Sequence, residues 1–242
     1  MVLVAFDIPA MANVLSDAVN RANIAGRVDI RDGAAGPTLE LTLLTGNRMP
    51  FSLDLAKARA WLAEGPGIEA DATHDAADNL VITPRSEGAV HHLIARLIAP
   101  HILAESVGQQ LRDALTHHQL SAYVEIRRSD LIQVEIRDGN ELAQAVRLSA
   151  LLGADKIADK LKLGRPKGIH KLADRMAWLL IGALGPGVRV KAHIGCGCAC
   201  EDGEDAVHVG LSVAQASLLV ERIRAVPSAD RAEDALAAEA AE

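Results

Sequence analysis

The sequence predicts an α+β protein of repeated helix–strand–strand–helix units, whose strands join into antiparallel sheets covered by helices. Residues 15–32 and 111–128 resemble each other at a fixed offset without a gap. Each copy has apolar residues at helical spacing, followed by the period-two alternation of a strand. The identities are Leu15/Leu111, Asp17/Asp113, Ala18/Ala114, Val28/Val124, Ile30/Ile126 and Arg31/Arg127. Self-similarity at a fixed period indicates a repeated structural unit.

The first unit, residues 1–64, has its opening helix and strand within 15–32. A second alternating strand is predicted at 38–44, and a second helix at 54–65. The segment 65–79 is rich in Gly, Ala and Asp and has no apolar period. It is predicted to be a linker.

The second unit, residues 80–153, begins with a short strand at 79–83. A helix follows, which Ser86 is expected to cap and Pro100 to end, because proline disfavours helical geometry in the residue before it. The remaining elements of this unit are a helix and strand within 111–128, a strand at 130–136 and a helix at 140–153.

A third, more divergent unit is predicted over residues 169–226. Its elements are a helix at 171–184, a strand at 188–194, a strand at 206–211 and a helix at 212–224. A basic connector, 154–168, precedes this unit, and an acidic tail, 227–242, follows it. The tail has almost no sizeable apolar residue and is predicted to be a frayed helix or disordered.

The composition is that of a soluble, cytoplasmic protein. Half of the 242 residues are apolar, which allows an ample core, although aromatic residues make up only 2%. No apolar run approaches the roughly 18 residues of a membrane span, and no basic segment precedes the first apolar stretch, as it would in a signal peptide. Three cysteines confined to one short stretch argue against a secreted disulfide framework. The excess of alanine is typical of a high-GC bacterial genome.

The net charge of −7 is unevenly distributed along the chain. Residues 156–175 hold seven basic side chains against Asp159 and Asp174, a net charge of +5, so the rest of the chain carries −12. A basic element on an acidic body is typical of a segment that contacts phosphate. The residues predicted to contact nucleic acid are Lys156, Lys160, Lys162, Arg165, Lys167, His170, Lys171 and Arg175.

Residues 155–176 also resemble a helix-turn-helix, although the turn is longer than usual. Two short helices are expected to separate at Gly164-Arg165-Pro166. The packing positions are Ile157, Ala158, Leu161 and Leu163 in the first helix and Ile169, Leu172 and Met176 in the second. The alternative interpretation is a solvated pair of helices that connects the second and third units.

A run of cysteines continues the alternation of strand 188–194. Because alternate residues share one face of a strand, these thiols are predicted to be buried small hydrophobes without a cofactor. The alternative is a zinc or redox site formed if the chain curls after Ile194, although the C-x-C-x-C spacing is shorter than that of known structural zinc sites. The ligands of that site would be Cys196, Cys198, Cys200, His193 and His208.

The sequence favours a protein that is not an enzyme. It contains no GxGxxG, Walker lysine or GxSxG, and the histidines between His91 and His118 lack the i, i+4 spacing that chelates a metal. The favoured function is a DNA-binding or otherwise nucleic-acid-associated regulatory protein that contacts phosphate through 156–175 and is expected to form a homo-oligomer, most simply a dimer. The first alternative is an assembly module that forms a homo-oligomer without nucleic acid. The second alternative is a metal- or redox-responsive protein that uses the cysteine run.

Overall fold

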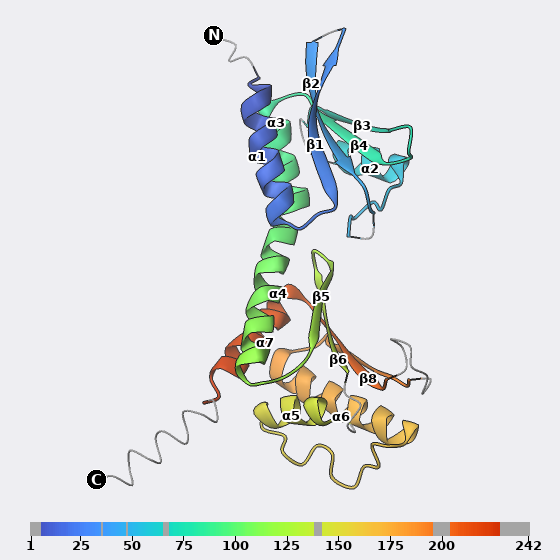
Figure 1. Cartoon of the computed structure of the whole chain (residues 1–242), viewed down its shortest axis with the longest axis vertical. Coiled ribbons are helices and arrows are strands. Elements are labelled where there is room, and N and C mark those ends of the chain that lie inside the picture. The colour runs from blue at the N-terminus through green and yellow to red at the C-terminus, as the bar shows by residue number, and fades with distance from the viewer. Residues whose placement is uncertain are drawn as a thin grey trace, which may run out of the picture. The chain divides into compact units, whose positions relative to one another are not determined.

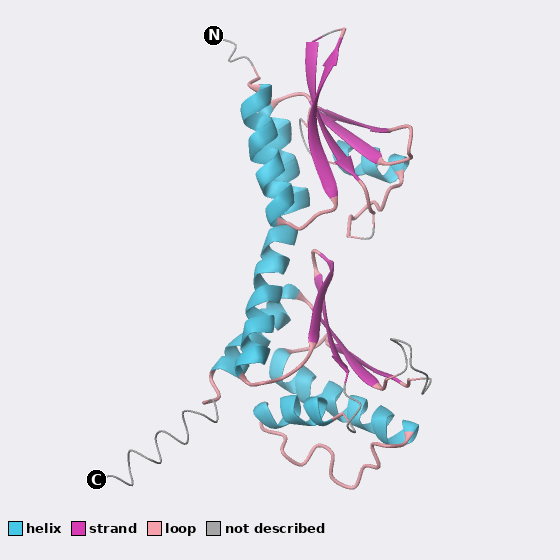
Figure 2. Cartoon of the chain, in the orientation of Figure 1, coloured by secondary structure: helices cyan, strands magenta, loops and turns pink. Residues whose placement is uncertain are grey.

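The computed structural model describes residues 6–34, 36–46, 48–64, 68–137, 142–195 and 204–227. These residues form an α+β fold, as the sequence predicts, with two four-stranded antiparallel sheets (Figures 1 and 2). The described residues divide into two compact units. The first lies within 1–105 and includes Arg127–Asp130, and the second lies within 106–126 and 131–242.

The first sheet has the strand order β1-β2-β4-β3. The elements of this unit are α1 (Ile8–Arg21), β1 (Gly26–Gly33), β2 (Gly36–Leu43), α2 (Leu55–Ala63), β3 (Ala70–His74), β4 (Leu80–Pro84) and α3 (Glu87–Leu93). Its core joins the fully buried Leu15 of α1 to Leu41 of β2 and Ile82 of β4, and these two strand residues are register partners. Burial of alternate strand residues and of one helix face explains why both amphipathic patterns were visible in the sequence.

The helix after β4 does not end at Pro100, contrary to the sequence prediction. Ser86 caps α3 by accepting a hydrogen bond from the Ala89 N–H at 3.2 Å, but the helix continues through a π-helical turn, η1 (Ile94–Ile98), into α4 (Ala99–His117). Proline lacks an N–H and clashes with the carbonyl four residues earlier in an α-helix. A wider π turn relieves that clash, and the Ala99 N–H accordingly bonds to the Ile94 carbonyl.

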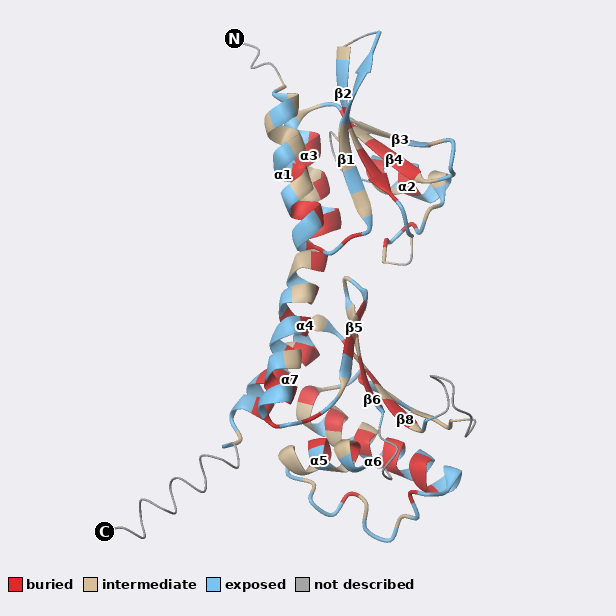
Figure 3. Ribbon diagram, viewed as in Figure 1, coloured by how far each residue is buried: buried red, intermediate tan, exposed pale blue. Residues whose placement is uncertain are grey.

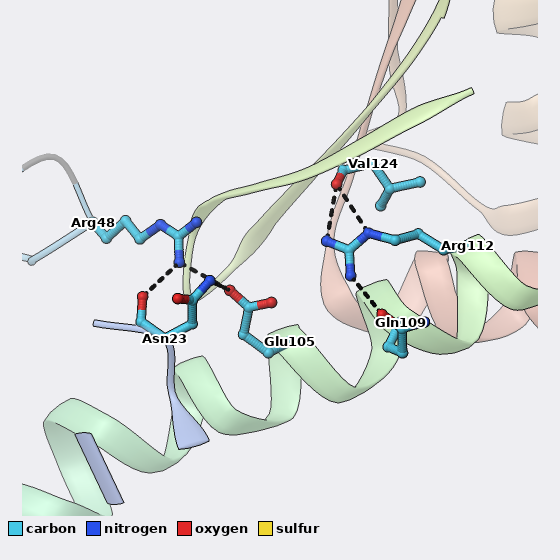
Figure 4. A network of polar contacts seen from close by, with 6 residues as sticks. All are labelled: Asn23, Arg48, Glu105, Gln109, Arg112 and Val124. Atoms are coloured by element: carbon cyan, nitrogen blue, oxygen red, sulfur yellow. Dashed lines mark hydrogen bonds and ion pairs between the residues drawn. The ribbon is translucent and has the colours of Figure 1, made fainter. Parts of the chain in front are cut away.

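The second sheet has the strand order β5-β6-β8-β7, which corresponds strand by strand to the order β1-β2-β4-β3 of the first sheet. Its strands and helices are β5 (Tyr123–Arg128), β6 (Leu131–Arg137), α5 (Ala143–Leu151), α6 (Pro166–Leu184), β7 (Arg189–His193), β8 (Ala206–Leu211) and α7 (Val213–Arg224). Helix α4 is tied to β5 by Arg112, which donates to the Val124 carbonyl at 3.0 and 3.3 Å (Figure 4).

The predicted repeat is loosely consistent with these elements, because α1-β1-β2-α2 and α4-β5-β6-α5 have the same order. Burial is not equal in the two copies. Val124 and Ile126 are buried, whereas Ile30 is 44% exposed. Ile30 lies on the outer part of the β1–β2 hairpin, where most residues are exposed (Figure 3).

The two strands of the expected third unit, β7 and β8, instead complete the second sheet, because β8 pairs with β6. Strands β3 and β4 occupy the same positions in the first sheet, and β3 lies within the expected linker 65–79. Only residues 64–69 separate α2 from β3, whereas residues 152–188 separate α5 from β7. Helix α6 and the basic stretch therefore belong to an addition in the second unit that has no counterpart among the described residues of the first.

The charges of a polar network in the first unit act on one buried histidine. Arg48 Nη1 lies 2.9 Å from Glu105 Oε1 and donates to the Asn23 carbonyl at 3.2 Å (Figure 4). His101, one turn before Glu105 on α4, is 1% exposed, and its Nδ1 has no partner among the described residues. Burial lowers the pKa of His101 and the charge of Arg48 adds to this effect, while Glu105 and Asp130 oppose it.

We expect the protein to lose stability as the pH falls below 6.5, the ordinary pKa of histidine. Below that value the unfolded chain binds a proton that His101 resists in the folded state, so protonation favours unfolding. Replacing His101 with Leu should remove this contribution. Thermal unfolding of both proteins at pH 5 and pH 7.5 measures it, and an equal pH dependence in the two proteins would contradict the assignment.

Candidate anion-binding site

The segment before α6 is a series of turns and not the first helix of a helix-turn-helix. Backbone hydrogen bonds join each N–H to the carbonyl three residues earlier at Ile157, Asp159, Leu161 and Arg165. Lys160 has a left-handed φ of 62°. A right-handed helix cannot continue through a residue in this conformation, which strains a residue that has a side chain. Figure 2 shows this segment as a loop. Isolated short helices are marginal in water, and here only Ile157 and Leu163 are buried as apolar anchors.

Arg175 holds the turn segment against α6. Its Nη1 donates to the Ile157 carbonyl at 2.6 Å and to the Asp159 carbonyl at 3.1 Å. The guanidinium therefore braces the backbone, a role that the sequence did not reveal when it predicted Arg175 as a phosphate contact.

The N-terminus of α6 follows this segment without a side-chain cap. Arg165 is the N-cap residue in an extended conformation, without a side-chain capping bond, and Pro166 follows it. Gly168 is buried and packs against the backbone of Lys162, where a Cβ would lie 2.6 Å from the carbonyl carbon. The positive end of the helix dipole thus adjoins the turn segment.

A cavity of about 230 Å³ lies at this helix end. Its lining residues are Lys160, Leu161, Lys162, Arg165, Lys167, Gly168 and Lys171. The five basic side chains are exposed, no acidic residue lines the cavity, and within the described chain none of the five is paired with a carboxylate. Unpaired cations beside a helix N-terminus form a ready binding site for an anion such as phosphate.

The cavity gathers five of the eight residues that the sequence predicted to contact nucleic acid. Lys156 and Arg175 instead line a neighbouring open hollow of about 560 Å³. His170 is exposed on α6 but is not among the lining residues. Trp178 lies in a continuous apolar run, so no sequence pattern marks it, yet it is 77% exposed on the same helix.

The alternative metal site falls largely outside the described residues, because these do not include Cys196, Cys198 and Cys200. His193 and His208 lie on β7 and β8 with ring centroids 5.8 Å apart, and His208 Nδ1 lies 2.9 Å from the Gln133 side-chain nitrogen. In the described ranges, no three or more His, Cys, Asp or Glu side chains are grouped to hold a metal ion.

No described helix is long and apolar enough to cross a membrane. Comparison with known proteins finds no match to this chain among protein-family models, curated proteins or solved structures.

Proposed function

We propose that this chain is a cytoplasmic, non-enzymatic protein that binds nucleic acid, with backbone phosphates held at the N-terminus of α6. The observation that carries the proposal is the cavity of about 230 Å³, which is lined by five basic side chains and no carboxylate; none of the five is paired with a carboxylate of the described residues. Five cations exceed what one phosphate group requires, whereas a polymer of phosphates can engage several at once. Contacts of this kind supply most of the sequence-independent affinity of nucleic-acid-binding proteins.

The charge of the remaining chain supports a localised interface. Outside residues 156–175 the chain carries −12, which repels a polyanion from most other surfaces. A cationic cavity on an acidic body therefore directs a phosphate chain to one place.

The decisive variant replaces Lys167 and Lys171 together with Ala. Both line the cavity from exposed positions on α6, and Ala is a good helix former, so thermal stability should stay almost unchanged. Each lost contact flattens the log–log dependence of affinity on salt by about 0.9 on duplex DNA and about 0.7 on a single strand. Titrations of labelled oligonucleotides between low and moderate salt should therefore show a slope reduced by roughly 1.4–1.8.

A matched control replaces Arg222 and Arg224 with Ala, which removes the same charge from the exposed surface of α7. This control should keep the slope of the wild-type protein. An equal loss in both variants would mean that only net charge matters. Absence of binding to any duplex or single strand at low salt would refute the proposal and leave homo-oligomer assembly as the better account.

A further inference from the structure

Trp178 is the most exposed large apolar side chain of the described residues, at 77%. The core side of α6 is already filled by Leu172, Met176 and Leu180, which are all buried. The other tryptophan, Trp61, contacts Phe51 edge to face, with ring centroids 5.7 Å apart. Trp178 therefore leaves an indole ring in water without contributing to the packing of the second unit.

The position of Trp178 connects it to the cationic cavity. Lys167, Lys171 and Trp178 follow the i, i+4, i+11 spacing of a single helix face, and all are exposed. With a rise of 1.5 Å per residue, Trp178 lies about 10 Å along the axis from Lys171. A strand whose phosphates occupy the cavity can extend along this face to reach the indole ring.

Asp174 lies between Lys171 and Trp178 on the same face and is also exposed. Its carboxylate repels phosphate, so the group that approaches the ring is uncharged. A nucleobase meets this requirement and presents a flat π surface to the indole. Bases of a duplex are already stacked on one another, whereas those of a single strand are free to stack on an aromatic side chain.

We infer that Trp178 stacks on an unpaired base of single-stranded nucleic acid whose phosphates lie in the cavity at the N-terminus of α6. This inference rests on the proposed function and assigns the preferred form of the ligand. A cationic groove combined with an aromatic platform is how single strands are bound without sequence preference.

The experiment uses the full chain carrying Trp61→Phe, in which Trp178 is the only tryptophan. Its emission is followed during titration with oligo(dT), with an abasic strand of the same length and with a duplex. Oligo(dT) should quench the emission, while the abasic strand should bind without quenching it. Measured with labelled strands, Trp178→Ala should weaken oligo(dT) binding by roughly 5- to 150-fold, as expected for one stacked base, and leave binding of the abasic strand unaffected. Trp178→Phe should restore most of the lost affinity.

Three other results would each overturn the inference. Equal affinity for oligo(dT) and the abasic strand, with constant emission, would overturn the inference while leaving the proposed function intact. Absence of binding by every probe would overturn both. If Trp178→Ala changes the mass of the protein in sedimentation, the ring covers a second copy of the chain and the inference is wrong.

Discussion

Replacing Gly168 with Ala is expected to destabilise the protein by about 1–3 kcal/mol, the usual cost of overpacking, and to disrupt the anion-binding cavity. A Cβ at this position would lie 2.6 Å from the carbonyl carbon of Lys162. Backbone cannot move aside as a flexible side chain does, so either α6 or the turn segment must shift. Because Lys160 and Lys162 belong to that segment, their amino groups would separate from Lys167 and Lys171, and affinity for oligonucleotides should fall together with stability.

Gly182→Ala is the matched control on the same helix. Apart from its chain neighbours and the adjacent backbone of α6, no described heavy atom lies within 4 Å of the Cβ that it would add, and alanine favours a helix over glycine by about 0.5–1 kcal/mol. This variant should therefore be slightly more stable and bind oligonucleotides normally. Denaturant unfolding and the salt titrations described above measure both effects. A stabilising effect of Gly168→Ala would show that the close approach of the two backbones is not needed.

The sequence predicted the second sheet best where two signals agreed. In residues 206–224, apolar alternation predicted the strand and apolar residues at helical spacing predicted the helix; the structure adds that Ser212 forms a capping box with Gln215 at the start of α7. Both periodicities depend on neighbouring residues alone, so they are visible in the sequence. Pro100 shows the limit of local rules, because the cost of proline in the helix depends on whether a π turn can form before it.

The candidate site was predictable in part. Five cations within twelve residues could be read from the sequence, but their meeting at one cavity depends on the left-handed Lys160 and on the brace that Arg175 provides. Trp178 was missed because residues 176–181 are apolar throughout. In such a run, periodicity cannot show which side chain faces water, because that depends on how α6 packs in the folded protein.

The repeat makes a prediction about the two cores. Leu15 of α1 and Leu111 of α4 occupy equivalent positions and are both fully buried. Replacing either with Ala removes buried carbon atoms and leaves a cavity that the surroundings fill only in part, which typically costs about 2–5 kcal/mol. Unfolding of both variants is followed by circular dichroism, and amide hydrogen exchange shows which unit has lost stability.

The matched controls are apolar residues with exposed side chains in the same units. Val14, next to Leu15, is 40% exposed, and Leu218 of α7 is 43% exposed. Their replacement with Ala should change stability by no more than about 0.5 kcal/mol. A large loss in Leu15→Ala and Leu111→Ala, with little change in the controls, supports equivalent core positions in the two copies. A cost below about 1 kcal/mol at Leu111 alone would mean that the likeness between residues 15–32 and 111–128 does not extend to packing.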